Sequence, residues 1–276
     1  MQILSKAKPI VRWEEKPHKG VEMFKIGIIG GSGLDNPDIL KNPQEVNIET
    51  PYGKPSSTLT CGKIEGVDIA ILARHGKQHT IRPSQVNFRA NIWALKEIGC
   101  THILAATAVG SLREEIEPGH LVFPDQFIDF TKKREKTFFA EDEVVHTPMA
   151  EPFCPNLRQL LKESAEALDI KHHIDKTLIT IEGPRFSTKA ESHMFRAWNA
   201  DVINMSTVPE VVLAREKKVH YASVAMSTDY DCWREGEESV TWEMIVNTMK
   251  NNSDSVISLF VNTIPKIQMY DDVCSD

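Results

Sequence analysis

The residues best suited to chemistry in this chain are two aspartates, Asp229 and Asp231, separated by one tyrosine. They follow the apolar run YASVAM at residues 221–226, which is typical of a buried strand. Side chains two positions apart at a strand end point to the same side, at an edge of the sheet where ligands usually bind. Neighbouring carboxyl groups push their pKa values apart, so one can hold a proton while the other stays charged. Such a pair can donate a hydrogen bond to ring nitrogen 7 of adenine and accept one from its 6-amino group.

Potential anion-binding groups stand at the predicted ends of other strands. The first strand, residues 25–29, leads into a glycine-rich turn in which backbone N–H groups can approach an anion closely. Arg74 offers a planar fork for phosphate oxygens, and His75 adds a donor whose protonation can follow the charge of the ligand. Thr107 and Ala108 end a further strand and offer a hydroxyl and a free N–H group. The hydroxyl donors together are Ser32, Thr107 and Ser206. Because the carboxyl ends of strands converge in an open α/β sheet, the sequence predicts an oxyanion pocket.

The glycine-rich turn fits other nucleotide motifs poorly. A dinucleotide fingerprint counted from Gly31 requires a glycine at the position of Asn36, and Pro37 follows at once. There is no Gly-Lys-Ser/Thr for a phosphate-binding loop, and Leu34 replaces the second glycine of a nucleophile elbow. An NAD-dependent oxidoreductase is therefore the weaker alternative.

Composition excludes several classes of protein. The 276 residues carry a formal charge of −7, which disfavours a nucleic-acid partner. No apolar run reaches the roughly 18 residues that span a membrane. The five cysteines are scattered and form no Cys-x-x-Cys pair, which predicts neither disulfides nor a zinc site and favours a cytoplasmic protein. Residues 1–24 lack the apolar core of a secretory signal, so we interpret them as an extension before one domain at 25–276.

Apolar strands alternate with amphipathic helices, which predicts a single α/β domain with a central, mixed but largely parallel twisted sheet flanked by helices. Strands are expected at residues 25–29, 58–61, 67–73, 101–108, 175–181, 201–205 and 221–226. Helices are expected at residues 83–98, 153–168, 189–198, 208–217 and 240–261. The charged segment 131–143 is expected to be an interface element or a mobile surface loop.

With these segments in place, the chain resembles the S-methyl-5′-thioadenosine phosphorylase branch of the trimeric purine nucleoside phosphorylase family. The resemblance extends from about residue 25 to residue 265. Its motifs are IGIIGGSGLD at 26–35, ARHG at 73–76, QHT at 78–80, NIWAL at 91–95, PMAEPF at 148–153, TIEGPRFS at 180–187, VINMSTVPE at 202–210 and TDYDCW at 228–233. Each motif alone is weak, but together they are specific.

The resemblance implies phosphorolysis of S-methyl-5′-thioadenosine to adenine and 5-methylthioribose 1-phosphate, in purine and methionine salvage. It implies a homotrimer without metal or organic cofactor, with inorganic phosphate as co-substrate. The phosphate-binding residues it implies are Ser32, Arg74, His75, Thr107, Ala108 and Ser206. The residues it implies around the nucleoside are Met205 at the sugar, Phe186 and Ser187 near the base, Asp229 and Asp231 on adenine, and His146 reaching the 5′ end of a neighbouring site. We expect Asp229 and Asp231 to be catalytic, and Trp242, Ile245 and Val246 to surround the 5′ group.

Departures from the family leave the 5′ preference open. Trp242 stands where a smaller aliphatic residue is common, and we expect the chain to end before a C-terminal helix that covers the 5′ group. A purine nucleoside phosphorylase with broader adenosine and inosine specificity is the main alternative. A purine nucleoside phosphorylase for inosine and guanosine is another, and it is expected to carry asparagine in place of Asp229. A non-catalytic nucleoside-binding protein is a further alternative, which should lack the phosphate donors.

Overall fold

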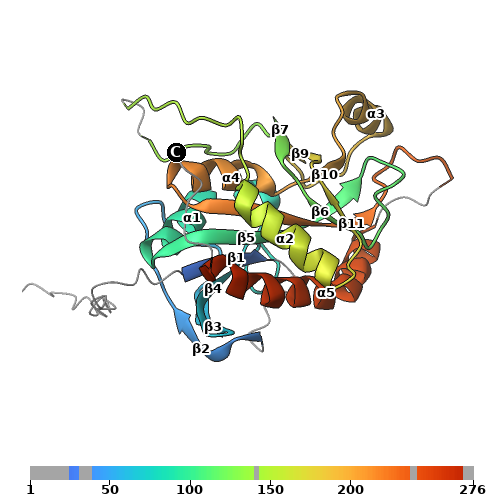
Figure 1. Cartoon of the computed structure of the whole chain (residues 1–276). Coiled ribbons are helices and arrows are strands. Elements are labelled where there is room, and N and C mark those ends of the chain that lie inside the picture. The colour runs from blue at the N-terminus through green and yellow to red at the C-terminus, as the bar shows by residue number, and fades with distance from the viewer. Residues whose placement is uncertain (1–24, 31–38, 140–142, 237–240, 270–276) are drawn as a thin grey trace, which may run out of the picture.

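One twisted sheet organises the protein, seen in a computed structural model that describes residues 25–30, 39–139, 143–236 and 241–269 (Figure 1). Within these residues the sheet has eleven strands: β1 (Lys25–Gly30), β2 (Lys41–Val46), β3 (Leu59–Ile64), β4 (Val67–Ala73), β5 (Cys100–Ser111), β6 (Leu121–Phe123), β7 (Gln126–Phe130), β8 (His172–Ile174), β9 (Thr177–Ile181), β10 (Val202–Asn204) and β11 (His220–Asp229). The main path runs β2-β3-β4-β1-β5-β10-β9-β7. Off this path, β11 pairs with β5 and β6, and β6 pairs with β8. Parallel pairs include β1 with β4 and β5, β5 with β11, and β9 with β7 and β10.

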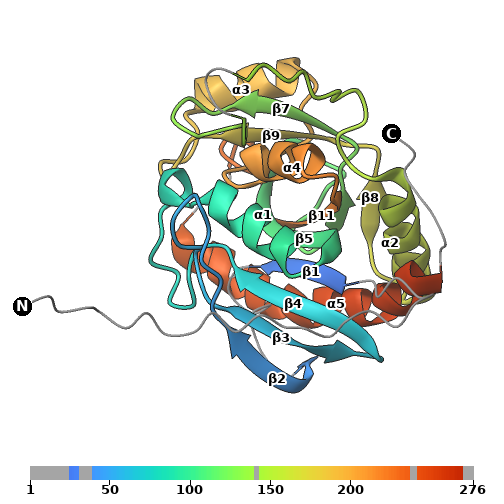
Figure 2. The same ribbon diagram turned by 90° about the vertical axis from the view of Figure 1, so that its left-hand side faces the viewer.

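Helices cover both faces of the sheet. They are α1 (Phe88–Glu97), α2 (Pro155–Ala167), α3 (Lys189–Ala197), α4 (Thr207–Glu216) and α5 (Trp242–Met269), with a short 3₁₀ turn η2 (Pro83–Gln85) before α1. Figure 2 shows α1 and α4 together over one face; α2 and α5 pack in the opposite hydrophobic core. The predicted α/β architecture with a mixed, mostly parallel sheet is therefore confirmed.

The first strand shows how the sequence divides its side chains between these two cores. Ile26 and Ile28 join the core under α2 and α5, whereas Ile29 joins the core under α1 and α4. This alternation follows from the two-residue period of a strand that is buried on both faces. Gly27 suits the close packing here, because a Cβ at this position would lie 3.2 Å from Ile103 Cγ1 and would require that side chain to shift.

Strand β5 creates the opening that the functional site uses. On one edge it pairs with β1 as far as Ala105, and it then pairs with β10 from Gly110 onwards. Among the residues that the structure describes, the backbone between these two registers has no strand partner on that edge, although β11 continues along the other. A change of partner strand of this kind leaves a crevice at the strand ends, which is where open α/β sheets bind ligands.

Several elements differ from the sequence prediction. The expected helix at residues 83–98 is split, because Asn87 caps α1 by accepting a hydrogen bond from the Ala90 N–H at 3.1 Å. Strand β5 is longer than expected and ends at Ser111. Strands β2, β6, β7 and β8 were not anticipated: β2 is largely exposed and lacks an apolar pattern, and β6 and β8 span only three residues each.

In the described residues, no helix combines the length and apolar character needed to cross a membrane. The segment after β7 makes specific contacts: buried Arg134 donates to the Val208 carbonyl at 2.6 Å and to the Glu182 carbonyl at 2.9 Å. Residues 140–142 of this segment lie outside the described chain.

Candidate active site

A cavity of about 360 Å³ lies where β4, β5, β10 and β11 end, a volume within the usual range for small-molecule sites. Eleven of the residues singled out from the sequence line it: Arg74, His75, Thr107, Ala108, Phe186, Ser187, Met205, Ser206, Asp229, Asp231 and Ile245. Four others are not among its lining residues, and one of them is Val246 of α5, next to Ile245. Ser32 and the Trp242 side chain lie outside the described part of the chain, and His146 is exposed elsewhere.

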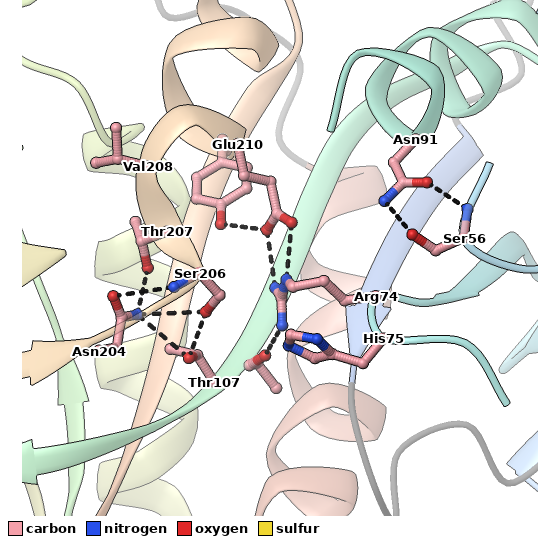
Figure 3. A network of polar contacts seen from close by, with 12 residues as sticks. Ser56, Arg74, His75, Asn91, Thr107, Asn204, Ser206, Thr207, Val208 and Glu210 are labelled. Carbon is pink, nitrogen blue, oxygen red and sulfur yellow. Dashed lines mark hydrogen bonds and ion pairs between the residues drawn. The ribbon is translucent and has the colours of Figure 1, made fainter. Parts of the chain in front are cut away.

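Arg74 is held at the end of β4 by a buried ion pair that the sequence analysis missed. Its Nε and Nη2 donate to the two carboxylate oxygens of Glu210, each at 2.8 Å, and Nη1 donates to the Ala106 carbonyl at 2.9 Å (Figure 3). The Tyr221 hydroxyl also donates to Glu210, at 2.7 Å. Burial alone would lower the pKa of Arg74, but the Glu210 carboxylate outweighs burial and raises it. A guanidinium has five N–H groups, and these contacts engage three, so two remain for a ligand.

The hydroxyl groups next to Arg74 belong to a buried amide network. Thr107 Oγ1 and Ser206 Oγ lie 2.8 Å apart. The Asn204 amide donates to Thr107 Oγ1 at 3.2 Å and to Thr207 Oγ1 at 2.7 Å (Figure 3). The Asn204 side-chain carbonyl accepts from Thr180 Oγ1 at 2.9 Å. Two hydroxyls that share one hydrogen bond between them retain one hydrogen for another acceptor. Thr107 Oγ1 also lies 3.2 Å from the Ala108 carbonyl oxygen, to which it can donate. The network therefore fixes both hydroxyls, and when Thr107 donates to Ser206 the Ser206 hydrogen is left for the cavity.

The backbone of β5 also lines the part of the cavity next to Arg74 and the two hydroxyl groups. Ala106 and Ala108 lie in the stretch between the β1 and β10 registers. Because alternate residues of a strand direct their N–H groups to the same edge, Ala108 N–H faces the edge on which Arg74 binds the Ala106 carbonyl. A guanidinium, a hydroxyl and a backbone N–H thus surround one small volume, an arrangement suited to an oxyanion.

His75 lies beside this group with its ring fixed by the local turn. Its Nδ1 is 2.9 Å from the Ile81 carbonyl oxygen, and the Ile81 N–H donates back to the His75 carbonyl at 3.1 Å. Burial, followed by the neighbouring Arg74 charge, lowers the pKa of His75 to about 4. The imidazole is therefore neutral at neutral pH.

Asp229 and Asp231, the acid pair, are positioned by a turn and not by strand alternation. Asp229 is the last residue of β11, whereas Asp231 adopts a left-handed conformation with φ of 51°. The expectation that both side chains follow the strand alternation is therefore corrected. Instead, the Asp231 N–H donates to Asp229 Oδ1 at 2.8 Å, and the Thr228 hydroxyl donates to Asp229 Oδ2 at 2.7 Å.

Burial shifts the acidity of both carboxyl groups in the direction that acid catalysis needs. Burial raises the pKa of Asp229 to about 6, against the opposing hydrogen bonds from Thr228 and the Asp231 N–H, and the Asp231 charge adds to the rise. Burial also raises the pKa of Asp231, although the nearby Ser192 and Ser187 hydroxyls lower it in part. With a pKa of about 6, the Asp229 carboxyl keeps its proton in a fraction of the molecules near neutral pH, so the site can supply a proton to a bound base.

Gly110 of β5 allows the acid pair to pack tightly against the sheet. A Cβ at this position would lie 3.0 Å from Asp229 Oδ1 and 3.3 Å from Asp231 Cβ. The remaining wall of the cavity is apolar and includes Met205, Ile245 and the partly exposed Phe186. A flat ring that is bound at the acid pair thus has apolar surface beside it.

Sequence reasoning overlooked Glu210, Asn204 and Thr228, all of which support residues that line the cavity. Asn204 and Glu210 fall within the VINMSTVPE motif and Thr228 directly precedes the acid pair. A charged residue in the otherwise apolar run of α4 was an available signal, since a buried carboxylate requires a partner. Nothing in the sequence spacing identified that partner as Arg74, 136 residues away.

Comparisons with known proteins agree with this geometry. The model of the phosphorylase superfamily matches residues 25–265. An S-methyl-5′-thioadenosine phosphorylase of Xenopus tropicalis is 57% identical over 258 residues, which cover 91% of this chain and 92% of the relative. One from Danio rerio is 58% identical over 252 residues, which cover 90% of each chain.

Solved structures give the same picture. Methylthioadenosine phosphorylase from Schistosoma mansoni in complex with adenine has a TM-score of 0.86 and 42% identity, covering 90% of this chain and 93% of that one. A mutant of adenosine/methylthioadenosine phosphorylase from the same organism, in complex with methylthioadenosine, has a TM-score of 0.85 and 41% identity with the same coverage.

Proposed function

This chain belongs to the phosphorylase superfamily, and we propose that it catalyses the phosphorolysis of S-methyl-5′-thioadenosine to adenine and 5-methylthioribose 1-phosphate. The proposal rests on one observation above all: Arg74 and Asp229 line the same cavity. An anion-binding group and a proton-holding carboxyl pair can therefore act on one bound nucleoside. Relatives with more than half of their residues identical carry this activity in their names.

Bound phosphate is both nucleophile and counter-charge. One phosphate oxygen attacks the anomeric carbon of the sugar as the bond to the base breaks, and positive charge develops on the sugar. Arg74 uses its two remaining N–H groups on the phosphate, and the Thr107–Ser206 hydroxyl pair and Ala108 N–H supply further donors. Fixing the nucleophile next to the carbon that it attacks is the main contribution of such groups.

The acid pair assists the departing base. The proton held by Asp229 is donated to ring nitrogen 7, which neutralises the negative charge on the leaving adenine. General acid catalysis of this kind contributes typically about 10²–10⁴-fold. In the overall balance, the ribosyl carbon replaces the hydrogen of monohydrogen phosphate, and adenine gains one hydrogen.

The same pair selects the base. Adenine presents an acceptor at ring nitrogen 7 and a donor at its 6-amino group, which match a protonated and a charged carboxyl group. A 6-oxopurine presents an acceptor to the charged oxygen, and mismatched buried polar groups reduce specificity constants by up to about 10⁴–10⁵. This chemistry favours adenine nucleosides over inosine and guanosine.

The 5′ group is proposed to contact apolar side chains of α5, including Ile245, which lines the cavity. We expect the enzyme to work as a cytoplasmic homotrimer, with His146 of one subunit completing the 5′ side of a neighbouring site. We expect no metal or organic cofactor, with inorganic phosphate as co-substrate.

Adenine release from S-methyl-5′-thioadenosine, measured with and without inorganic phosphate, tests the activity. Release that depends on phosphate and yields one sugar phosphate per adenine is the expected result. Release without phosphate indicates hydrolysis, and binding without release indicates a nucleoside-binding protein. Equal catalytic efficiency with adenosine contradicts the proposed 5′ selectivity, and equal efficiency with inosine contradicts the assignment of the acid pair.

Complementation tests the shared site. In a homotrimer with His146 reaching across, His146→Ala removes the contact at the 5′ end from every site. Asp229→Asn removes the acid carboxyl group from every site. Mixed trimers contain some sites with both wild-type groups, so mixing after dissociation and reassembly restores activity above that of either variant alone. If the mixture has only the average activity of the two variants, His146 does not act on a neighbouring site.

A further inference from the structure

The direction of the hydrogen bond at His75 indicates which oxyanion this site accepts. This inference rests on the proposed phosphorolysis. The Ile81 carbonyl oxygen, 2.9 Å from Nδ1, can only accept a hydrogen bond. Nδ1 therefore carries the hydrogen of the neutral ring, and Nε2 carries a lone pair. The turn itself enforces this tautomer, since the Ile81 N–H binds the His75 carbonyl at 3.1 Å and holds Ile81 opposite the ring.

The surroundings keep the ring neutral. His75 is next to the buried Arg74 cation, and the ring of His79 lies 4.7 Å away, centroid to centroid. Burial and these neighbours depress the pKa of His75 to about 4, outweighing the hydrogen bond to Ile81. At neutral pH Nε2 is thus a hydrogen-bond acceptor, which differs from the donor role expected from the sequence.

The other groups of the anion site are donors, and their formal charge is already balanced. The Arg74 cation is paired with Glu210 through two hydrogen bonds of 2.8 Å. Figure 3 shows the His75 ring extending beside the Arg74 guanidinium, on the side of Thr107. Two divalent oxyanions carry the same charge, so the charge of the site does not distinguish them. A single hydrogen-bond acceptor among donors does, because only an anion that carries a hydrogen can donate to it.

We propose that His75 is the residue that selects a protonated oxyanion: its Nε2 accepts a hydrogen bond from the P–OH group of monohydrogen phosphate. Sulfate has the same shape and charge but no hydrogen, so one of its oxygens meets the Nε2 lone pair. Leaving a buried acceptor unsatisfied weakens binding by about 5- to 150-fold. The site thus takes phosphate and arsenate and discriminates against sulfate and selenate.

The test measures dissociation constants of these four anions at pH 8 by calorimetry, on the wild-type protein. Sulfate is expected to bind at least about tenfold more weakly than phosphate, and selenate at least about tenfold more weakly than arsenate. The pairs match in size, so a common ratio points to the hydrogen. Equal affinities within each pair overturn the proposal.

Two variants and one spectroscopic measurement separate His75 from the rest of the site. His75→Gln places amide N–H donors near the anion and is expected to bring the sulfate to phosphate ratio close to one. His79→Gln makes the same change in the adjacent ring and is expected to retain the ratio. A His75→Gln variant that retains the full ratio overturns the proposal.

Nitrogen-15 NMR of histidine-labelled wild-type enzyme needs no variant. With saturating phosphate, His75 should show a pyrrole-type Nδ1 and a pyridine-type Nε2; a hydrogen on Nε2 overturns the proposal. These outcomes are distinct from a failure of the proposed reaction. Phosphate selectivity without adenine release leaves the acceptor role intact, and phosphorolysis with equal sulfate affinity removes it.

Discussion

Replacing Asp229 by asparagine should make the protein more stable and much less active. Asparagine fits the same contacts: its carbonyl can accept from the Asp231 N–H, as Oδ1 does at 2.8 Å, and its amide can donate to Thr228 Oγ1. The Thr228 hydroxyl then donates to the Val109 carbonyl, which already lies 3.2 Å away. No buried polar group loses its partner in this arrangement.

The magnitude follows from the acidity of Asp229. Burial raises its pKa from 3.8 to about 6 in the folded protein, and each pKa unit corresponds to about 1.36 kcal/mol. A raised carboxyl pKa favours the folded state fully only below pH 3.8, and this advantage is lost as pH rises through about 6. At pH 8 the ionised carboxylate therefore disfavours folding by at most about 3 kcal/mol, and at pH 5 this penalty is about half as large.

The measurement is urea unfolding of wild type and Asp229→Asn at pH 5 and pH 8, at one protein concentration, because subunit association contributes to stability. The variant should gain stability at both pH values, and more at pH 8. Asp169→Asn is the matched control, since Asp169 is exposed and has a φ of 52° that asparagine adopts readily. It should show little change.

Activity should move in the opposite direction. Without the carboxyl proton, release of adenine from S-methyl-5′-thioadenosine should fall by about 10²–10⁴-fold, while activity on inosine rises relative to it. The reasoning is refuted if the variant retains full activity on S-methyl-5′-thioadenosine, or if it is less stable than wild type at pH 8.

Three further substitutions test the supports of the site. Glu210→Gln leaves the buried Arg74 cation unpaired, so the free energy of unfolding should fall by about 3–5 kcal/mol. Saturating phosphate should raise the thermal midpoint of this variant more than that of wild type, and equal shifts would contradict the pairing. Gly110→Ala puts a methyl group 3.0 Å from Asp229 Oδ1, so kcat/KM should fall at least about tenfold while folding loses about 1–3 kcal/mol; unchanged kinetics would show that the acid pair tolerates displacement. Ser206→Ala removes a hydroxyl and should raise the KM for phosphate by about fivefold, whereas the KM of Ser206→Thr should stay close to that of wild type. Equal KM values for phosphate in the two variants would exclude the hydroxyl from phosphate binding.

Much of the fold could be predicted because its signals are local. The run at β11, the stripe of leucines in α2 and the paired strands β3 and β4 each carry a period or a turn within a few residues. Elements with weak local signals were missed. β2 presents exposed polar residues, and β6 and β8 are three-residue strands whose pairing partners lie far along the chain.

The sequence by itself determined which residue types stand at strand ends: an arginine fork, hydroxyls and two carboxyl groups. Tertiary structure alone decided what those groups can do. The Glu210 partner of Arg74 is 136 residues away, and the Asp229 environment depends on Gly110 in another strand. The tautomer of His75 depends on a turn closed by Ile81. Burial, charge pairing and hydrogen-bond direction depend on atoms that only folding brings together, so residue spacing along the chain cannot reveal them.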